Sequence, residues 1–207
     1  NYCIAQVTIT NNGIAITNLN HNIYVNGSII NQTTGFIQNS GTLNVNGDIT
    51  NNGTSAFSDS TSGEIVLNGS GQKIGGTHVL NFHKLILDSP DTLRLDQSIR
   101  VLDSLSFTSG FINLNGHTLD LDSSGYLQNE RLASHVFGIA GKITAKKYLA
   151  QPLITDNTGG LGLRLRSGNN HGSTTIERSH FRQPAADSSI YRFYKVTSLF
   201  PNTIDSI

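Results

Sequence analysis

The chain repeats a short phrase in which apolar positions alternate with other residues and Asn-Gly follows. Complete copies lie at residues 23–27, 43–47, 65–69 and 112–116, and a degenerate copy lies at residues 93–97. Alternation places both apolar side chains of a copy on one face of a β-strand. The central apolar positions are separated by 20, 22, 28 and 19 residues. A repeat of about 20 residues is typical of a solenoid.

The central apolar residues also indicate where the coils lie. In chain order they are Val25, Val45, Leu67, Leu95 and Leu114. A partial copy at residues 85–88 places Leu87 at 20 residues after Leu67. We interpret the longest separation as one normal coil plus an offset strand, which predicts an irregular coil between Leu67 and Leu95. Residues 7–19 are expected to form a first coil that is also irregular.

No helical periodicity of useful length occurs before residue 130. Because one coil of about 20 residues cannot bury its inner face alone, successive coils must stack at strand spacing and pair their backbones. We therefore predict an all-β fold, a parallel β-helix or β-solenoid, over residues 6–129. Its open ends would expose unpaired strand edges, so self-association through the solenoid ends is a further expectation.

The Asn-Gly steps are predicted to be turns, since glycine allows positive φ angles and asparagine tolerates them. Equivalent asparagines on successive coils would stack into a hydrogen-bonded ladder along the axis. The predicted turn ladder consists of Asn26, Asn46, Asn68 and Asn115 with Gly27, Gly47, Gly69 and Gly116. Turn conformation and stacking account for these residues, so they carry no evidence for a functional site.

The composition changes near residue 130. Residues 1–130 hold four Lys or Arg against ten Asp or Glu, whereas residues 131–207 hold ten against four, so net charges of −6 and +6 cancel. One interpretation is that the basic half meets a polyanion such as an acidic polysaccharide or nucleic acid. The other, favoured because the basic residues are scattered, is that two modules have different solvated faces or dock on each other.

Residues 130–207 are predicted to be a β-rich cap or the start of a second, sandwich-like module. Expected strands lie at residues 141–150, 162–167, 174–178 and 190–197. At the other end, residues 1–5 look like the remnant of a signal peptide, with Cys3 and Ala5 at the small-residue positions before a cleavage site.

A single cysteine excludes an internal disulfide framework. No apolar run approaches the roughly 18 residues of a membrane span. Polysaccharide lyases and hydrolases with this type of fold need clustered carboxylates, and the only Asp-x-Asp pair is Asp120 with Asp122, whose side chains should share a strand face. These two residues are the metal-site candidates. The seven histidines lack metal-ligand spacing, and no catalytic residue or cofactor site is predicted.

Several runs resemble large secreted surface proteins of Bacteroidetes that often carry a type IX secretion sorting signal. These runs are GEIVLNGSGQKIGG at residues 63–76, FHKLIL at 82–87 and LSFTSGFINL at 105–114. Residues 172–180 and 189–194 are similar to a β-module that commonly follows in such proteins. The resemblance implies a secreted or cell-surface location and an adhesin-like role.

Three functions follow as hypotheses. The first is a non-catalytic, extracellular structural or adhesive segment of a bacterial surface protein, with glycans or other surface proteins as partners and no nucleic acid. The second is a carbohydrate-active β-helix enzyme or glycan-binding module, which predicts a groove with two facing carboxylates and a Lys or Arg. The third is a subunit of an extracellular filament that assembles through its strand edges.

Overall fold

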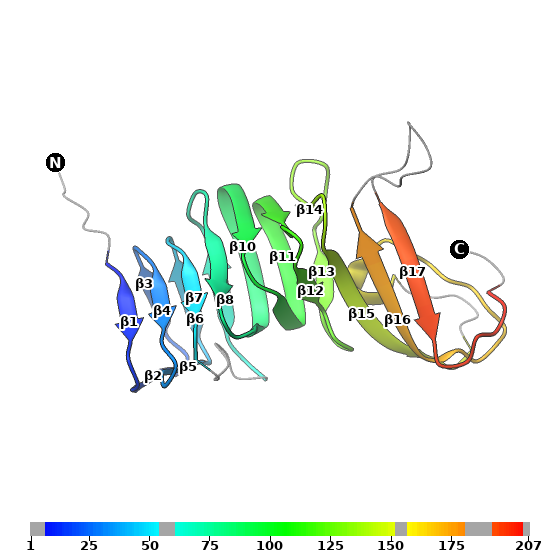
Figure 1. Cartoon of the computed structure of the whole chain (residues 1–207), viewed down its shortest axis with the longest axis horizontal. Helices are drawn as coiled ribbons and strands as arrows, with labels where there is room; N and C mark the ends of the chain where they lie inside the picture. The colour runs from blue at the N-terminus through cyan, green and yellow to red at the C-terminus, as the bar shows by residue number, and fades with distance from the viewer. Residues whose placement is uncertain (1–6, 54–60, 152–156, 181–191, 205–207) are drawn as a thin grey trace.

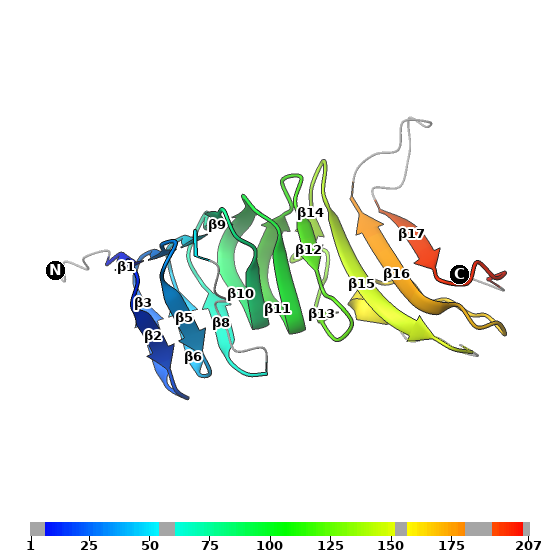
Figure 2. The same ribbon diagram turned by 60° about the horizontal axis from the view of Figure 1, so that its bottom comes forward.

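The computed structural model describes residues 7–53, 61–151, 157–180 and 192–204. It is nearly all β, with 55% strand and a parallel β-solenoid of about six turns, which confirms the predicted fold class. The coils stack in chain order along the long axis of the molecule, and a three-stranded antiparallel extension closes the C-terminal end (Figures 1 and 2). The only helical turn in these ranges is the 3-10 helix η1 (Thr158–Gly160).

The strands of successive coils form three faces of the solenoid. The first face holds β3 (Asn22–Val25), β6 (Thr42–Val45), β8 (Glu64–Leu67) and β13 (Tyr126–Gln128). The second holds β1 (Ile9–Asn11), β4 (Ile29–Asn31), β7 (Ile49–Asn51), β9 (Lys73–Gly76) and β14 (Val136–Phe137). The third holds β12 (Thr118–Asp120) and β15 (Lys142–Leu149), while β2 (Ala15–Asn18) and β5 (Phe36–Asn39) form a separate two-stranded sheet. The long strands β10 (Leu80–Leu95) and β11 (Ile99–Asn113) bend through all three faces.

The register shows a nearly even coil spacing on the first face, whereas the second face has a longer step of 25 residues, from Ile49 to Ile74. On the first face the paired residues are Val25, Val45, Leu67, Leu87 and Phe107. Leu95 instead pairs with Ile74 on the second face. The interpretation of the longest separation as one normal coil plus an offset strand is confirmed, because Leu87 stacks on Leu67 and Leu95 continues the second face. The stretch is irregular in its pairing, since β10 shifts register against β11 after Phe82 and again after Leu87. The first coil, by contrast, is in regular register, since Ile9 pairs with Ile29.

One hydrophobic core runs from the first coils into the C-terminal extension, from Val25 to Ile176. Alternation on the strands builds it: β8 and β6 each bury every second side chain. Stacked aliphatic residues from successive coils then fill the interior, and each buried Leu or Ile contributes roughly 1.5–3 kcal/mol through removal of apolar surface from water.

Buried asparagines form a ladder on the second face. The amide of Asn11 donates to Asn31 Oδ1 at 3.2 Å, and the amide of Asn31 donates to Asn51 Oδ1 at 3.0 Å. All three side chains are buried. A second, shorter step joins Asn18 Nδ2 to Asn39 Oδ1 at 2.7 Å. Each amide thus satisfies a polar group of the next coil inside the core, where an unpaired group would be costly.

These ladders use other asparagines than the predicted ones. Asn26 and Asn46 lie exposed at turns and Asn68 is half-buried. In the described ranges none of these three bonds to another through its side chain. Asn115, which has a φ of 48°, donates along the axis to Leu95 O at 3.0 Å and Asp96 Oδ1 at 3.1 Å. The predicted ladder was wrong because the corner asparagines do not reach one another: Asn26 and Asn46 are exposed, and Asn68 Oδ1 is buried with no hydrogen-bond partner in the described ranges.

The glycines of the repeated phrase are needed for space. A Cβ on Gly27 would lie 2.1 Å from Val7 O, and one on Gly69 would lie 1.7 Å from Asn46 O. Gly47 is equally tight against the backbone of Gly27. None of these three has a positive φ angle, whereas Gly116 does, with φ of 87° and no atom within 4 Å of the point that a Cβ would occupy. The expected reason for the glycines therefore holds only at Gly116, and close stacking of corner backbones explains the others.

The solenoid continues past the predicted boundary at residue 130. Residues 136–137 pair in parallel with β11, and the start of β15 pairs in parallel with β12. The whole of β15 also pairs antiparallel with β16 (Gly172–Ser179), which pairs antiparallel with β17 (Phe193–Ser198). The change from parallel to antiparallel pairing therefore occurs within a single strand, β15.

The C-terminal segment covers the end of the solenoid core. Leu161, Leu163 and Leu165 alternate into the core, but residues 162–167 do not form the predicted strand. A Cβ on Gly160 would lie 2.1 Å from Leu127 O, so η1 packs directly on the last coil. This packing favours the cap over the sandwich-like alternative.

The strands expected at residues 141–150 and 174–178 are confirmed as β15 and β16. The strand expected at 190–197 corresponds to β17 in its described part, and residues 190 and 191 lie outside the described residues, as do the predicted signal-peptide remnant and Cys3. Within the described ranges no helix has the length and apolar character to cross a membrane.

Candidate functional site

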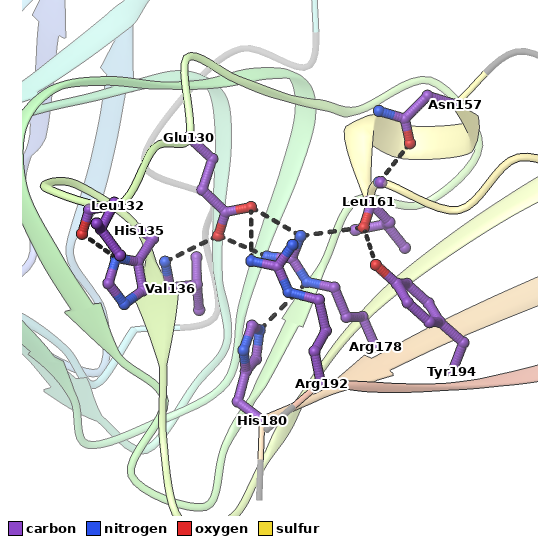
Figure 3. A network of polar contacts seen from close by, with 11 residues as sticks. Glu130, Leu132, His135, Val136, Asn157, Leu161, Arg178, His180, Arg192 and Tyr194 are labelled. Carbon is purple, nitrogen blue, oxygen red and sulfur yellow. Dashed lines mark hydrogen bonds and ion pairs between the residues drawn. The ribbon is translucent and has the colours of Figure 1, made fainter. Parts of the chain in front are cut away.

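A buried ion pair joins the cap to the last coil (Figure 3). Arg178 on β16 donates through Nη1 to Glu130 Oε2 at 2.8 Å and through Nη2 to Glu130 Oε1 at 2.7 Å. The Arg178 side chain is fully buried, and 11% of the Glu130 side chain is exposed. Arg178 also donates to Leu161 O at 3.1 Å, and Tyr194 Oη donates to the same oxygen at 2.6 Å. The guanidinium of Arg178 thus joins β16 to the cap segment at Leu161 and to the coil that ends at Glu130.

The charges around Glu130 and His180 fix their protonation. Burial raises the pKa of Glu130, but the hydrogen bonds and charge of Arg178, with smaller effects of the Val136 amide and Arg192, bring it below its ordinary value. Burial, together with the charges of Arg178 and Arg192, lowers the pKa of His180 to about 4. At neutral pH the pair is therefore ionised beside a neutral imidazole.

The hydrogen bonds also fix the tautomer of His180. Arg178 Nε donates to His180 Nε2 at 3.2 Å. Since guanidinium has no acceptor, Nε2 must carry the lone pair and the proton lies on Nδ1. The carboxylate of Glu130 accepts from Arg178 through both oxygens and also from the Val136 amide at 3.0 Å. This arrangement suits a fixed structural junction better than proton transfer, because the carboxylate is held in its ionised form.

A pocket of about 320 Å³ opens beside this junction, lined by Glu130, Arg131, Leu132, His135 and Arg192. His135 also belongs to a cluster of three rings. The ring of Phe111 lies edge-on to those of His135 and Phe137, with distances between ring centroids of 5.1 and 6.3 Å. Arg192 Nη2 lies 3.7 Å from Glu130 Oε2. The pocket therefore has an anionic floor that two arginines already neutralise.

A larger groove of about 590 Å³ lies between the turn before β13, strand β15 and η1. Its lining residues are Ser123, Ser124, Gly125, Tyr126, Lys146, Lys147, Asn157, Thr158, Gly159 and Arg164. Among the described residues, the lining contains three cationic side chains, one aromatic ring and no carboxylate. We refer to it as the basic groove.

A third hollow, of about 490 Å³, follows the corner beside the first face. Its lining is polar, with Asn, Ser and Thr side chains, and it includes Glu64, His83 and Lys84. Glu64 and Lys84 are direct neighbours in the register of β8 and β10, and Lys84 lies 3.9 Å from Asp103. We refer to it as the polar groove.

The predicted metal candidates do not form a site. Asp120 ends β12 and accepts from Arg100 Nε at 3.2 Å and Thr144 Oγ1 at 2.8 Å. Asp122 lies beyond the strand in a turn with φ of 50°, so the two carboxylates do not share a strand face as expected. Across residues 7–53, 61–151, 157–180 and 192–204, no three His, Cys, Asp or Glu side chains are grouped so that they could hold a metal.

Sequence reasoning missed both the buried ion pair and the basic groove. The signal for the first is that Arg178 follows Thr174 and Ile176 at inward positions of β16, where an arginine requires a buried partner. The partner, Glu130, is 48 residues away, and nothing local indicates it. Comparison of the chain with family models, curated proteins and solved structures finds no significant match.

Proposed function

We propose that the chain is a non-catalytic, extracellular structural and adhesive segment of a bacterial surface protein, a rigid solenoid whose outer surface binds glycans. The observation that carries the proposal is where the polar side chains lie. Those inside, such as Asn31 and Arg178, join one coil or cap segment to the next. Those outside line open grooves. A stacked repeat with a continuous core and hollowed outer faces is suited to holding an extended binding surface.

The test has two readouts on the full-length protein in its own cell. Antibody labelling of intact cells reports surface exposure, and retention on a panel of immobilised polysaccharides reports binding. We expect surface labelling and retention on at least one polysaccharide without new reducing ends. A protein found only in the cytosolic fraction, or polysaccharide shortened by the purified chain, would overturn the proposal.

The polar groove favours a second candidate function, a carbohydrate-active enzyme. Glu64 and Lys84 lie side by side there, with His83 in the same lining, and the described lining supplies one of the two expected carboxylates. A carboxylate next to a Lys is one arrangement used for acid–base chemistry on sugars. This candidate predicts slow polysaccharide cleavage that Glu64→Gln abolishes while Glu177→Gln, on the cap, leaves it unchanged. Cleavage that is equal in both variants would remove it.

A further inference from the structure

We infer that the basic groove binds a short acidic segment of a polysaccharide, through carboxylate or sulfate groups on its sugars. The inference rests on the proposed function and specifies it, since it names one groove and one chemical class of glycan. It also gives a meaning to the excess of basic residues after residue 130 that the scattered sequence positions did not suggest.

Within the described residues, two cations of the groove lack the carboxylate partner that Lys142 and Arg178 have in the same part of the chain. Lys142 Nζ lies 2.6 Å from Glu177 Oε1, and Arg178 Nη2 lies 2.7 Å from Glu130 Oε1. Lys146 and Arg164, by contrast, are exposed and form no ion pair within the described ranges. Lys147 lines the same groove. Lys146 and Arg164, on walls where no described residue supplies a carboxylate, create a positive potential that attracts an anion.

The remaining lining of the basic groove offers groups that suit a sugar. Tyr126 exposes 40% of its surface, so its ring offers an apolar face of the kind on which a sugar ring stacks. Ser123 and Ser124 place hydroxyls on one wall. Asn157 on the other wall uses its Oδ1 to accept from the Gly162 amide, which leaves its NH₂ group to donate. Hydroxyls, an amide and an aromatic ring suit neutral parts of a sugar between its charged groups.

Both walls of the basic groove are held in place by packing and backbone hydrogen bonds. The turn that carries Ser123 and Ser124 starts at Asp122 in a left-handed conformation and closes with Gly125 N donating to Leu121 O at 2.8 Å. A Cβ on Gly159 would lie 2.5 Å from Ala145 Cβ, so η1 lies tightly on β15. A groove whose walls are already ordered loses little conformational entropy when a ligand binds.

The size of the groove favours a sugar segment over nucleic acid. Its volume of about 590 Å³ is within the range of about 300–1,000 Å³ of sites for small ligands. Protein–nucleic acid interfaces bury roughly 1,000–2,500 Å² and are strongly basic over that whole area. This chain has a net charge of zero, and its solenoid half is acidic.

The experiment measures binding of fluorescent oligosaccharides to the full chain at low and physiological salt. The probes are an oligogalacturonate for carboxylate, a heparin-derived oligosaccharide for sulfate, a malto-oligosaccharide of equal length as the neutral arm, and single-stranded DNA of equal charge. The test variant is K146Q/R164Q. The matched control is R166Q/K195Q, which removes the same charge from exposed residues outside the groove. Thermal unfolding verifies that both variants fold.

We expect at least one acidic oligosaccharide to bind, with affinity that falls as salt rises. K146Q/R164Q should weaken binding by about tenfold or more, since charge-assisted hydrogen bonds are lost, whereas R166Q/K195Q should change it by less than about twofold. Tyr126→Ala should weaken binding further without altering its salt dependence. The better of the two acidic probes identifies the anionic group.

Binding of neither acidic probe would overturn the inference. So would equal binding of the neutral probe, tighter binding of DNA, or equal losses in the two double variants. These failures are distinct from failure of the proposed function. If the chain is retained on a polysaccharide and K146Q/R164Q has no effect, the groove assignment fails and the adhesive role stands. If intact cells show no surface labelling, the proposed function fails whatever the groove binds.

Discussion

Arg178 and Glu130 form two parallel hydrogen bonds of 2.7 and 2.8 Å across 48 residues of chain, with the guanidinium fully buried. The pair connects β16 of the cap to the end of the last coil. Removing one member leaves the other buried without its counter-charge, which typically costs about 3–5 kcal/mol.

We therefore expect Arg178→Met to lower the free energy of unfolding by roughly 3–5 kcal/mol, measured by urea denaturation at pH 7. The double variant R178M/E130Q should be less destabilised than R178M alone, since no buried charge remains unpaired. If the double variant loses as much as the sum of the two single variants, the two residues are not coupled and the junction is not held by this pair.

The neutral state of His180 predicts a pH dependence. Its pKa is about 4 in the folded chain, against 6.5 for the ordinary imidazole. Between these values the unfolded chain binds more protons, so stability falls as the pH is lowered from about 6.5 towards 4. The loss should reach roughly 2–3 kcal/mol. Glu130, whose pKa is lowered, contributes stability that is lost only at still lower pH, below its ordinary value of 4.5.

Urea denaturation between pH 4.5 and 7.5 measures this effect, with His180→Gln as the comparison because glutamine does not titrate. The difference in unfolding free energy between the two chains should shift in favour of the variant as the pH falls through this window. Parallel pH profiles would show that His180 is not the group responsible.

The buried asparagine ladder predicts a contrast between inner and corner asparagines. Asn31 donates to Asn51 Oδ1 and to Gly35 O, and it accepts from Asn11. Asn31→Ala leaves these buried groups unpaired and should cost about 2–3 kcal/mol. Asn46→Ala, at an exposed corner, should change stability by less than about 0.5 kcal/mol. Thermal unfolding of the two variants gives the comparison, and similar losses would argue against the ladder.

The corner glycines predict a second contrast. Gly69→Ala places a Cβ 1.7 Å from Asn46 O, so the coils must separate there, at a cost of roughly 3 kcal/mol. Gly116→Ala meets no atom within 4 Å and bears only the strain of its φ of 87°, about 1–2 kcal/mol. Urea denaturation should therefore give a lower unfolding midpoint for Gly69→Ala than for Gly116→Ala. A lower midpoint for Gly116→Ala would show that the φ angle, and not close stacking, requires glycine at the corners.

Alternating apolar residues and the period near 20 were sufficient to predict the solenoid and the strands β15 and β16. They could not assign the repeated phrase to a face, because the phrase has the same pattern on the first face at Leu67 and on the second at Leu95. That ambiguity left the face of the strand at Leu95 open, although its offset from the normal coil at Leu87 was predicted correctly. Pairing between coils resolves it, and the pairing depends on the whole stack.

A signal for the true ladder was present in the sequence. Ile9, Ile29 and Ile49 each precede an asparagine by two positions, at intervals of 20 residues. In a strand, positions two apart share a face, so these asparagines had to point inward with the isoleucines. The inward pattern of β16 indicated only that Arg178 is buried. No repeat pattern indicated its partner Glu130 or the basic groove, since each combines segments whose separation follows no repeat.

The stacking of one coil on the next also determines how the molecule should come apart. In the described part of the chain β1 pairs on one side only, with β4, and the first coil exposes the large apolar residues Val7, Ile14, Leu19 and Tyr24. In a linear array each unit is stabilised only by its neighbours, so opening can start at one end without disturbing the other. Amide hydrogen exchange should therefore be fastest in β1 to β3 and slowest in β10 and β11, as a gradient along the rod axis and not as one global unfolding event.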